Sequence, residues 1–153
     1  MRAAFTRYRP AMRLPTRHSL ATSLLDTVYI MEKKKLALLF SRQTFLVVIT
    51  DGWSNINRES VVNYVIWAPS MRPMMWSSGT TGAEAHTGDF MASEISRIIA
   101  EVESVAGIGK VSAVVSDNAA NMKKAGRLVE AEHPNVVFNE CSAHAMCSGA
   151  AVA

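Results

Sequence analysis

The spacing of apolar residues along the chain predicts three helices. Between Ser19 and about Phe40, apolar residues recur every three or four positions, which is typical of an amphipathic helix. A second helix is predicted from about Thr87 to Val105, with Gly107 as its stop signal. A third is predicted from Asn118 to about Ala131, with Asp117 placed to cap its first turn.

Short β-branched and aromatic runs between these helices predict five strands. The most apolar run, Thr44 to Thr50, suits a strand that is buried on both faces in the middle of a sheet, and the turn dipeptide Asp51-Gly52 ends it. The other four strands are predicted at residues 60–68, 74–78, 111–116 and 135–139. A helix followed by the order β-β-β-α-β-α-β predicts an α/β domain with a mixed sheet, in which a meander precedes two crossovers.

Composition is consistent with such a folded domain. The chain has 153 residues, of which 49% are hydrophobic and 19% charged, enough for one domain with a core. The longest wholly apolar runs are about five residues, far below the roughly 20 that span a bilayer, so we expect no membrane segment. Two cysteines, Cys141 and Cys147, are too few for a disulfide framework, which favours a reducing, intracellular setting.

Charge divides the chain unevenly. Residues 1–40 hold eight Lys and Arg against two acids, a net +6, and residues 41–153 hold eight against eleven, a net −3. Residues 1–17 therefore form a basic, irregular arm before a core at 18–153. The arm can contact phosphates, or it can be an ordinary solvated flank. A mitochondrial presequence is a third reading, which Pro10 and Pro15 weaken because they interrupt the helix that such a signal needs.

Two aspartates are the main candidates for chemistry. Asp51 and Asp117 each follow a strongly apolar strand, and functional groups gather at the carboxyl ends of strands in open α/β sheets. If the two strands are parallel neighbours, the carboxylates repel each other unless a divalent cation, Mg²⁺ or Mn²⁺, lies between them. Such cations support phosphodiester cleavage. The structural alternative is a turn residue at Asp51 and a helix cap at Asp117.

Three short motifs occur in a characteristic order. They are Asp51-Gly52-Trp53-Ser54, then Ser116-Asp117-Asn118-Ala119-Ala120-Asn121, then Cys141-Ser142-Ala143-His144. In this order and spacing they resemble hAT-superfamily transposases, and in particular the domain of unknown function, family 659 (DUF659), found in them. The resemblance covers roughly residues 9–147. Each motif alone is weak evidence, and the ordered set is specific.

The resemblance implies an RNase H-like fold and a DNA transposase ancestry. It implies Mg²⁺- or Mn²⁺-dependent DNA strand cleavage and transfer at transposon ends, in the nucleus, with Asp51 and Asp117 as catalytic residues and metal ligands. Supporting positions are Trp53, Asn118, Asn121, Cys141 and His144. Active relatives add a third acidic residue after a long helical insertion, and a dimerisation region. Neither is in this sequence, so we expect a core that is incomplete at its C-terminus and inactive by itself.

Other interpretations stay open. The chain can be a non-catalytic module that binds DNA or protein through the basic arm and the sheet edge, or a transposon remnant without function. A cytoplasmic or mitochondrial location is also open. His133, Cys141, His144 and Cys147 are all of types that bind zinc, but their separations match no familiar zinc finger, and packing or capping roles are the alternative.

Overall fold

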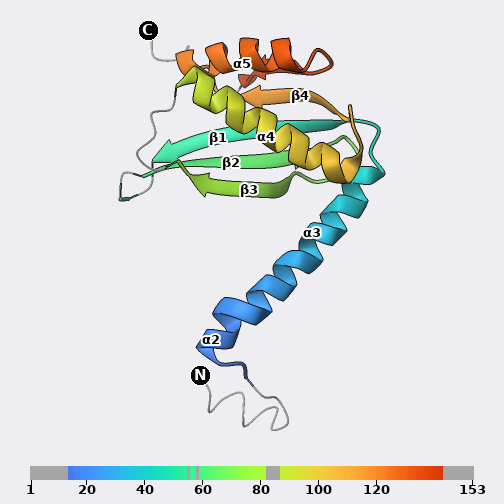
Figure 1. Cartoon of the computed structure of the whole chain (residues 1–153), viewed down its shortest axis with the longest axis vertical. Helices are drawn as coiled ribbons and strands as arrows, with labels where there is room; N and C mark the ends of the chain where they lie inside the picture. The colour runs from blue at the N-terminus through green and yellow to red at the C-terminus, as the bar shows by residue number, and fades with distance from the viewer. Residues whose placement is uncertain (1–13, 55, 58, 82–86, 143–153) are drawn as a thin grey trace. The chain divides into compact units, whose positions relative to one another are not determined.

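A computed structural model describes residues 14–54, 56–57, 59–81 and 87–142 of the chain (Figure 1). The chain forms two compact units, Met1–Leu36 and Ala37–Ala153. Among the described residues, none of the helices has the length and apolarity that crossing a bilayer requires.

The described part of the first unit is mainly helical. Thr16 caps the short helix α2 (Arg17–Ser19), because its hydroxyl accepts a hydrogen bond from the Ser19 backbone N–H (3.1 Å). One π-helical segment, η1 (Leu20–Leu24), follows, and α3 (Leu25–Ser41) then continues into the second unit. The predicted helix between Ser19 and Phe40 is therefore confirmed, with a wider turn near its start.

The second unit is a five-stranded mixed sheet with two long helices. Its elements are β1 (Leu46–Ser54), β2 (Ser60–Trp67), β3 (Met74–Thr80), α4 (Gly88–Ala106), β4 (Val111–Ser116), α5 (Ala120–Glu132) and β5 (Val137–Glu140). The strand order is β3-β2-β1-β4-β5. β1 pairs antiparallel with β2 and parallel with β4, and β4 pairs parallel with β5. The α/β class and the β-β-β-α-β-α-β order after a helix are thus confirmed.

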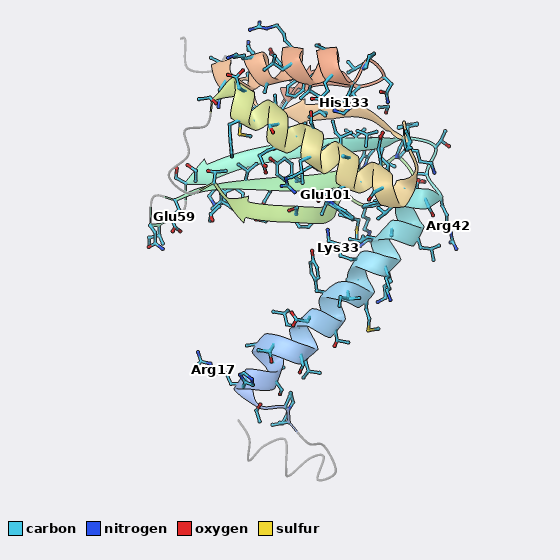
Figure 2. All side chains as sticks on the ribbon, viewed as in Figure 1. Arg17, Lys33, Arg42, Glu59, Glu101 and His133 are labelled. Atoms are coloured by element: carbon cyan, nitrogen blue, oxygen red, sulfur yellow. The ribbon has the colours of Figure 1, made fainter. Side chains whose placement is uncertain are left out.

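The core lies between one face of the sheet and α4 and α5 (Figure 1). Side chains alternate along β1, so Leu46, Val48 and Thr50 are buried on this face. The fully buried apolar residues of α4 include Ile95, Ile98, Ile99 and Val102. Its Glu101 accepts a hydrogen bond from the indole N–H of Trp76 on β3 (3.3 Å), which ties the helix to that edge (Figure 2).

The other face of β1 is less covered than its apolar run predicts. Val47 and Ile49 are only partly buried, because α4 and α5 both pack on the opposite face of the sheet. The expected central position of this strand is confirmed, and the expectation that both of its faces are buried is wrong.

Several boundaries also differ from the sequence prediction, and two of them lie at the candidate aspartates. β1 continues through Asp51-Gly52 to Ser54, because these residues pair in register with Asn63 and Val62 of β2. The α5 helix begins at Ala120, with Ala119 and not Asp117 at the N-cap. Gly107 does end α4, at a φ of 121° that favours glycine.

Candidate functional site

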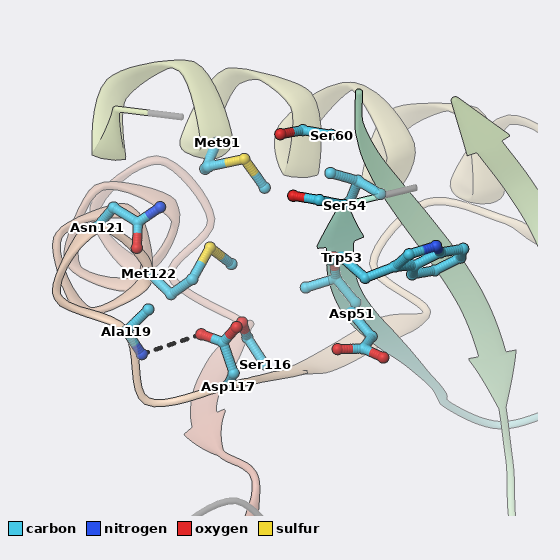
Figure 3. Close-up of a pocket in the computed structure, with 13 residues that line it drawn as sticks. Asp51, Trp53, Ser54, Ser60, Met91, Ser116, Asp117, Ala119, Asn121 and Met122 are labelled. Atoms are coloured by element: carbon cyan, nitrogen blue, oxygen red, sulfur yellow. Dashed lines mark hydrogen bonds between the residues drawn. The ribbon is translucent and has the colours of Figure 1, made fainter. Parts of the chain in front are cut away.

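The parallel pairing of β1 and β4 brings Asp51 and Asp117 to one edge of the sheet. Ile49 is in register with Val115, and each aspartate lies two residues further along the chain, Asp51 within β1 and Asp117 directly after β4. Both line a pocket with a volume of about 160 Å³ at the carboxyl ends of these strands (Figure 3). The sequence predicted that the two carboxylates share an edge if their strands are parallel neighbours, and β1 and β4 are such neighbours.

The pocket is built from the sheet edge and the first turns of two helices. Hydroxyl side chains from the ends of β1, β2 and β4 form much of its wall, and the starts of α4 and α5 close it. The lining residues other than the two aspartates are Thr50, Gly52, Trp53, Ser54, Ser60, Val62, Met91, Ser116, Ala119, Asn121 and Met122.

The two carboxylates have different surroundings. Asp51 is exposed at the edge of the sheet. Asp117 is partly buried, and its Oδ1 accepts a hydrogen bond from the Ala119 backbone N–H (3.0 Å), which fixes the carboxylate at the entry to α5 (Figure 3). This hydrogen bond explains why the cap prediction for Asp117 fails: the carboxylate accepts from the N-cap residue itself, in a tight turn that begins three residues before the first helical residue.

Three buried oxygen atoms close to these aspartates have no hydrogen-bond partner among the described residues. They are Asn63 Oδ1, Ser116 Oγ and Asn118 Oδ1. Asn63 is the cross-strand partner of Asp51, and the other two residues flank Asp117 in the sequence. An unpaired buried polar group costs about 1–3 kcal/mol. Of these three residues, Ser116 lines the pocket, and Asn63 and Asn118 are not part of its lining.

The other predicted site residues are found in several surroundings. Trp53 and Asn121 line the pocket, and the Trp53 side chain remains 46% exposed. The Cys141 backbone N–H donates to the Ser116 carbonyl (2.7 Å), so Cys141 lies beside the end of β4. His144 and Cys147 lie outside the described residues.

His133, the first member of the zinc alternative, has an identified role at the end of α5 (Figure 2). Its Nε2 lies 3.1 Å from the hydroxyl of Ser96, which donates to Glu132 at 2.7 Å. These contacts join α4 to α5. Because the Ser96 hydroxyl donates its proton to the Glu132 carboxylate, His133 does not activate Ser96 as a nucleophile. Across the described ranges, three or more His, Cys, Asp or Glu side chains nowhere gather closely enough to hold a metal ion.

Sequence reasoning missed Ser116 as a pocket residue, and Asn63 as a buried polar residue paired with Asp51 across the strands. Asn63 interrupts the otherwise apolar strand SVVNYVIW, and a polar residue in such a run is the signal that could have found it. Ser116 is the last residue of β4 and is only 1% exposed. The residues around it in the sequence give no sign that its hydroxyl has no partner among the described residues.

The model of one protein family, described as a domain of unknown function (DUF659), matches residues 15–148. The chain belongs to the DUF659 family. Among curated proteins, none matches the chain. The DUF659 match contains α3, the whole sheet and both helices that pack on it, so the pocket with Asp51 and Asp117 lies inside the family's own region.

Proposed function

We propose that this DUF659 domain is the core of a hAT-type, RNase H-like DNA transposase, and that Asp51 and Asp117 bind Mg²⁺ or Mn²⁺ for strand cleavage and transfer. The observation that supports this most directly is the pair of carboxylates at the ends of adjacent parallel strands, both lining one pocket. DNA at transposon ends is the substrate and the nucleus the location that this proposal implies.

The donor set suits a hard cation. Carboxylate and amide oxygens are the ligands that Mg²⁺ and Mn²⁺ prefer. Asp51, Asp117 and the side-chain amide of Asn121 line the pocket and are of this kind. When bound, the cation supplies charge stabilisation and an activated water. The protein holds the Asp117 carboxylate in place through the Ala119 N–H, so that little reorganisation is needed.

The described residues provide two acids to this site, and no third acid joins them. The third acidic residue of an active transposase must therefore come from outside the described part of the chain. Cation binding is accordingly the step that this chain is proposed to perform, and it is the step to test.

The test is calorimetric titration of Mn²⁺ into the purified chain and into the Asp51→Asn, Asp117→Asn double variant. We expect binding by the natural chain and none by the double variant. Asp26→Asn is the matched control, because Asp26 lies on α3 in the first unit and should leave the binding unchanged.

Failure of a well-folded natural chain to bind Mn²⁺ would overturn the proposal. Double-stranded DNA binding that weakens with salt, and that persists in the double variant, would then favour the alternative of a non-catalytic DNA-binding module. A cooperatively folded chain that binds neither Mn²⁺ nor DNA would favour a protein-binding module. A chain that unfolds with poor cooperativity would favour a transposon remnant.

A further inference from the structure

β3 lies at one edge of the sheet, and part of its backbone faces away from its neighbour. Within the described part of the chain, β3 pairs with β2 alone. The Thr81 N–H donates to the Ser60 carbonyl of β2 (3.0 Å), and backbone groups alternate in direction along a strand. The N–H and C=O groups of Ser78 and Thr80 therefore face the free edge, while those of Gly79 between them face β2.

The side chains of β3 leave this edge open to pairing. Natural edge strands are commonly protected by charged residues, proline or a bulge. The sequence of β3, MMWSSGT, has no charged residue and no proline, and the irregularity in its pairing lies opposite Tyr64 and Val65. The residues after that point, Ser77–Thr80, pair with β2 without interruption. They offer a regular row of donors and acceptors to an added strand.

A hollow of about 370 Å³ opens beside the same residues, between β3 and the N-terminal half of α4. α4 crosses the sheet obliquely and meets β3 further along, where Glu101 accepts from Trp76 (Figure 1). On the face that α4 covers, β3 contributes the small residues Ser77 and Gly79 to the hollow. A Cβ added at Gly79 would meet no atom within 4 Å beyond its chain neighbours, so the hollow reaches this glycine.

The walls of the hollow suit an aromatic side chain. Val62 and Tyr64 of β2 and Phe90 of α4 supply apolar and aromatic surface. Aromatic side chains bury a large area, and they pack favourably against other rings. Because Ser77 and Gly79 leave the space above β3 unfilled, a ring that enters from the free edge has room beside these residues.

The charges in the hollow favour a ring over a phosphate. Arg97 lines it, and its guanidinium donates to Glu94 (2.8 and 3.2 Å) and also to Glu101. One positive charge is thus held between two negative ones, which gives little attraction for a nucleic-acid backbone. A planar guanidinium that is fixed in this way still offers its face to an aromatic ring.

We propose that the β3 edge binds an extended segment of a partner protein, which adds to the sheet as a further strand and inserts an aromatic side chain into the hollow. The segment pairs with the backbone of Ser78 and Thr80, so its residue opposite Gly79 points to the face where the hollow lies. A second copy of this chain fits less well. Its own β3 edge would bring Ser77 and Gly79 to that face, and the hollow would stay empty. This interaction is independent of the cation binding proposed above.

The probe is the fluorescein-labelled peptide Lys-Thr-Val-Thr-Phe-Thr-Val-Thr-Lys, and fluorescence anisotropy measures its binding to the purified chain. With its phenylalanine opposite Gly79, the two adjacent threonines face Ser78 and Thr80. N-methylation of these two threonines removes the N–H donors of the added strand and should abolish binding. N-methylation of the two valines is the matched control. Their N–H groups face away from β3, so binding should persist.

Gly79→Leu fills the hollow from the protein side. Its Cβ enters open space, so the variant should fold and should bind the probe at least about tenfold more weakly. Ser78→Leu is the matched control, because Ser78 is in register with Asn63 and its side chain lies on the opposite face of the sheet. This control should bind as the natural chain does. A probe with alanine in place of phenylalanine should also bind about tenfold more weakly.

Each contrary result overturns the proposal. Absence of probe binding by the folded chain does so directly, and equal binding of the two methylated peptides would show that no strand is added. A folded Gly79→Leu variant with undiminished affinity would show that the ring does not enter the hollow. If that variant does not fold, the alanine probe decides the same point. A dimer of the chain in sedimentation that the probe cannot dissociate would assign the edge to a second copy, and displacement of the probe by oligothymidylate would assign it to nucleic acid.

Discussion

Replacing Ser116 by alanine should make the protein more stable in the absence of ligand. The hydroxyl is buried and unpaired among the described residues, so the folded state carries the desolvation cost of that group, about 1–3 kcal/mol. Alanine keeps the Cβ atom and loses one oxygen. A void of that size costs only a few tenths of a kcal/mol, at about 24 cal/mol per Å³.

The difference is a gain of about 1 kcal/mol in the free energy of unfolding. For a chain of this length, that corresponds to a rise of roughly 2–4 °C in Tm. Urea denaturation followed by tryptophan fluorescence in the presence of EDTA measures it, because Trp76 is buried in the core. The midpoint should rise with an unchanged m-value.

Ser112→Ala is the control on the same strand. Its hydroxyl has a backbone acceptor on β1, so its loss should reduce the free energy of unfolding by up to about 1 kcal/mol. If Ser116→Ala instead lowers stability as much as this control does, the Ser116 hydroxyl has a partner in the folded protein. The reasoning that this buried hydroxyl has no partner would then be refuted. A gain in stability would mean that the natural residue is maintained against a folding cost, as at many binding sites.

Other substitutions test the packing around the site. Gly126→Ala would place a Cβ 2.6 Å from Phe138 Cδ1. The overpacking cost of about 1–3 kcal/mol should exceed the gain of about 1 kcal/mol in helix propensity. Urea unfolding should therefore show a lower free energy of unfolding, and a Phe138→Leu background should remove this loss. Thr87→Ala should cost about 1 kcal/mol in thermal unfolding, and Thr87→Ser should not, because the Thr87 hydroxyl accepts from the Phe90 N–H (3.2 Å). Burial raises the pKa of Tyr64 to about 12, so an absorbance titration should show one tyrosine that ionises at high pH, and Tyr64→Phe should remove this step. The free energy of unfolding should fall between pH 10 and 12, because only the unfolded chain loses the Tyr64 proton there.

Much of the fold follows from local signals. The apolar run before Asp51 predicts a central strand, and Gly107 marks the end of α4, because burial and backbone conformation act on neighbouring residues. The strand does not end at Asp51-Gly52, since distant partners on β2 extend its pairing. A dipeptide that favours a turn is overruled by cross-strand hydrogen bonds, and sequence spacing alone gives no information about them.

The site was only partly predictable. The positions of Asp51 and Asp117 after apolar strands singled them out, but their approach depends on the parallel pairing of β1 with β4, which no local pattern specifies. The sequence could not predict that the Ser116 hydroxyl has no partner among the described residues. Whether a buried hydroxyl has an acceptor depends on every neighbour that the fold brings to it.

The strand order has a consequence for how the protein folds. β1, β2 and β3 form a meander of neighbours in sequence, which can pair early and locally, whereas Ile49 meets Val115 across 66 positions of the chain. Loop-closure entropy delays this long-range contact, so the β1–β4 junction should form late. Since the two carboxylates come to one pocket only at that junction, the proposed cation affinity should appear with the last stage of folding. A metal-sensitive probe would then report completion of the sheet, while fluorescence of the meander's tryptophans would report its beginning.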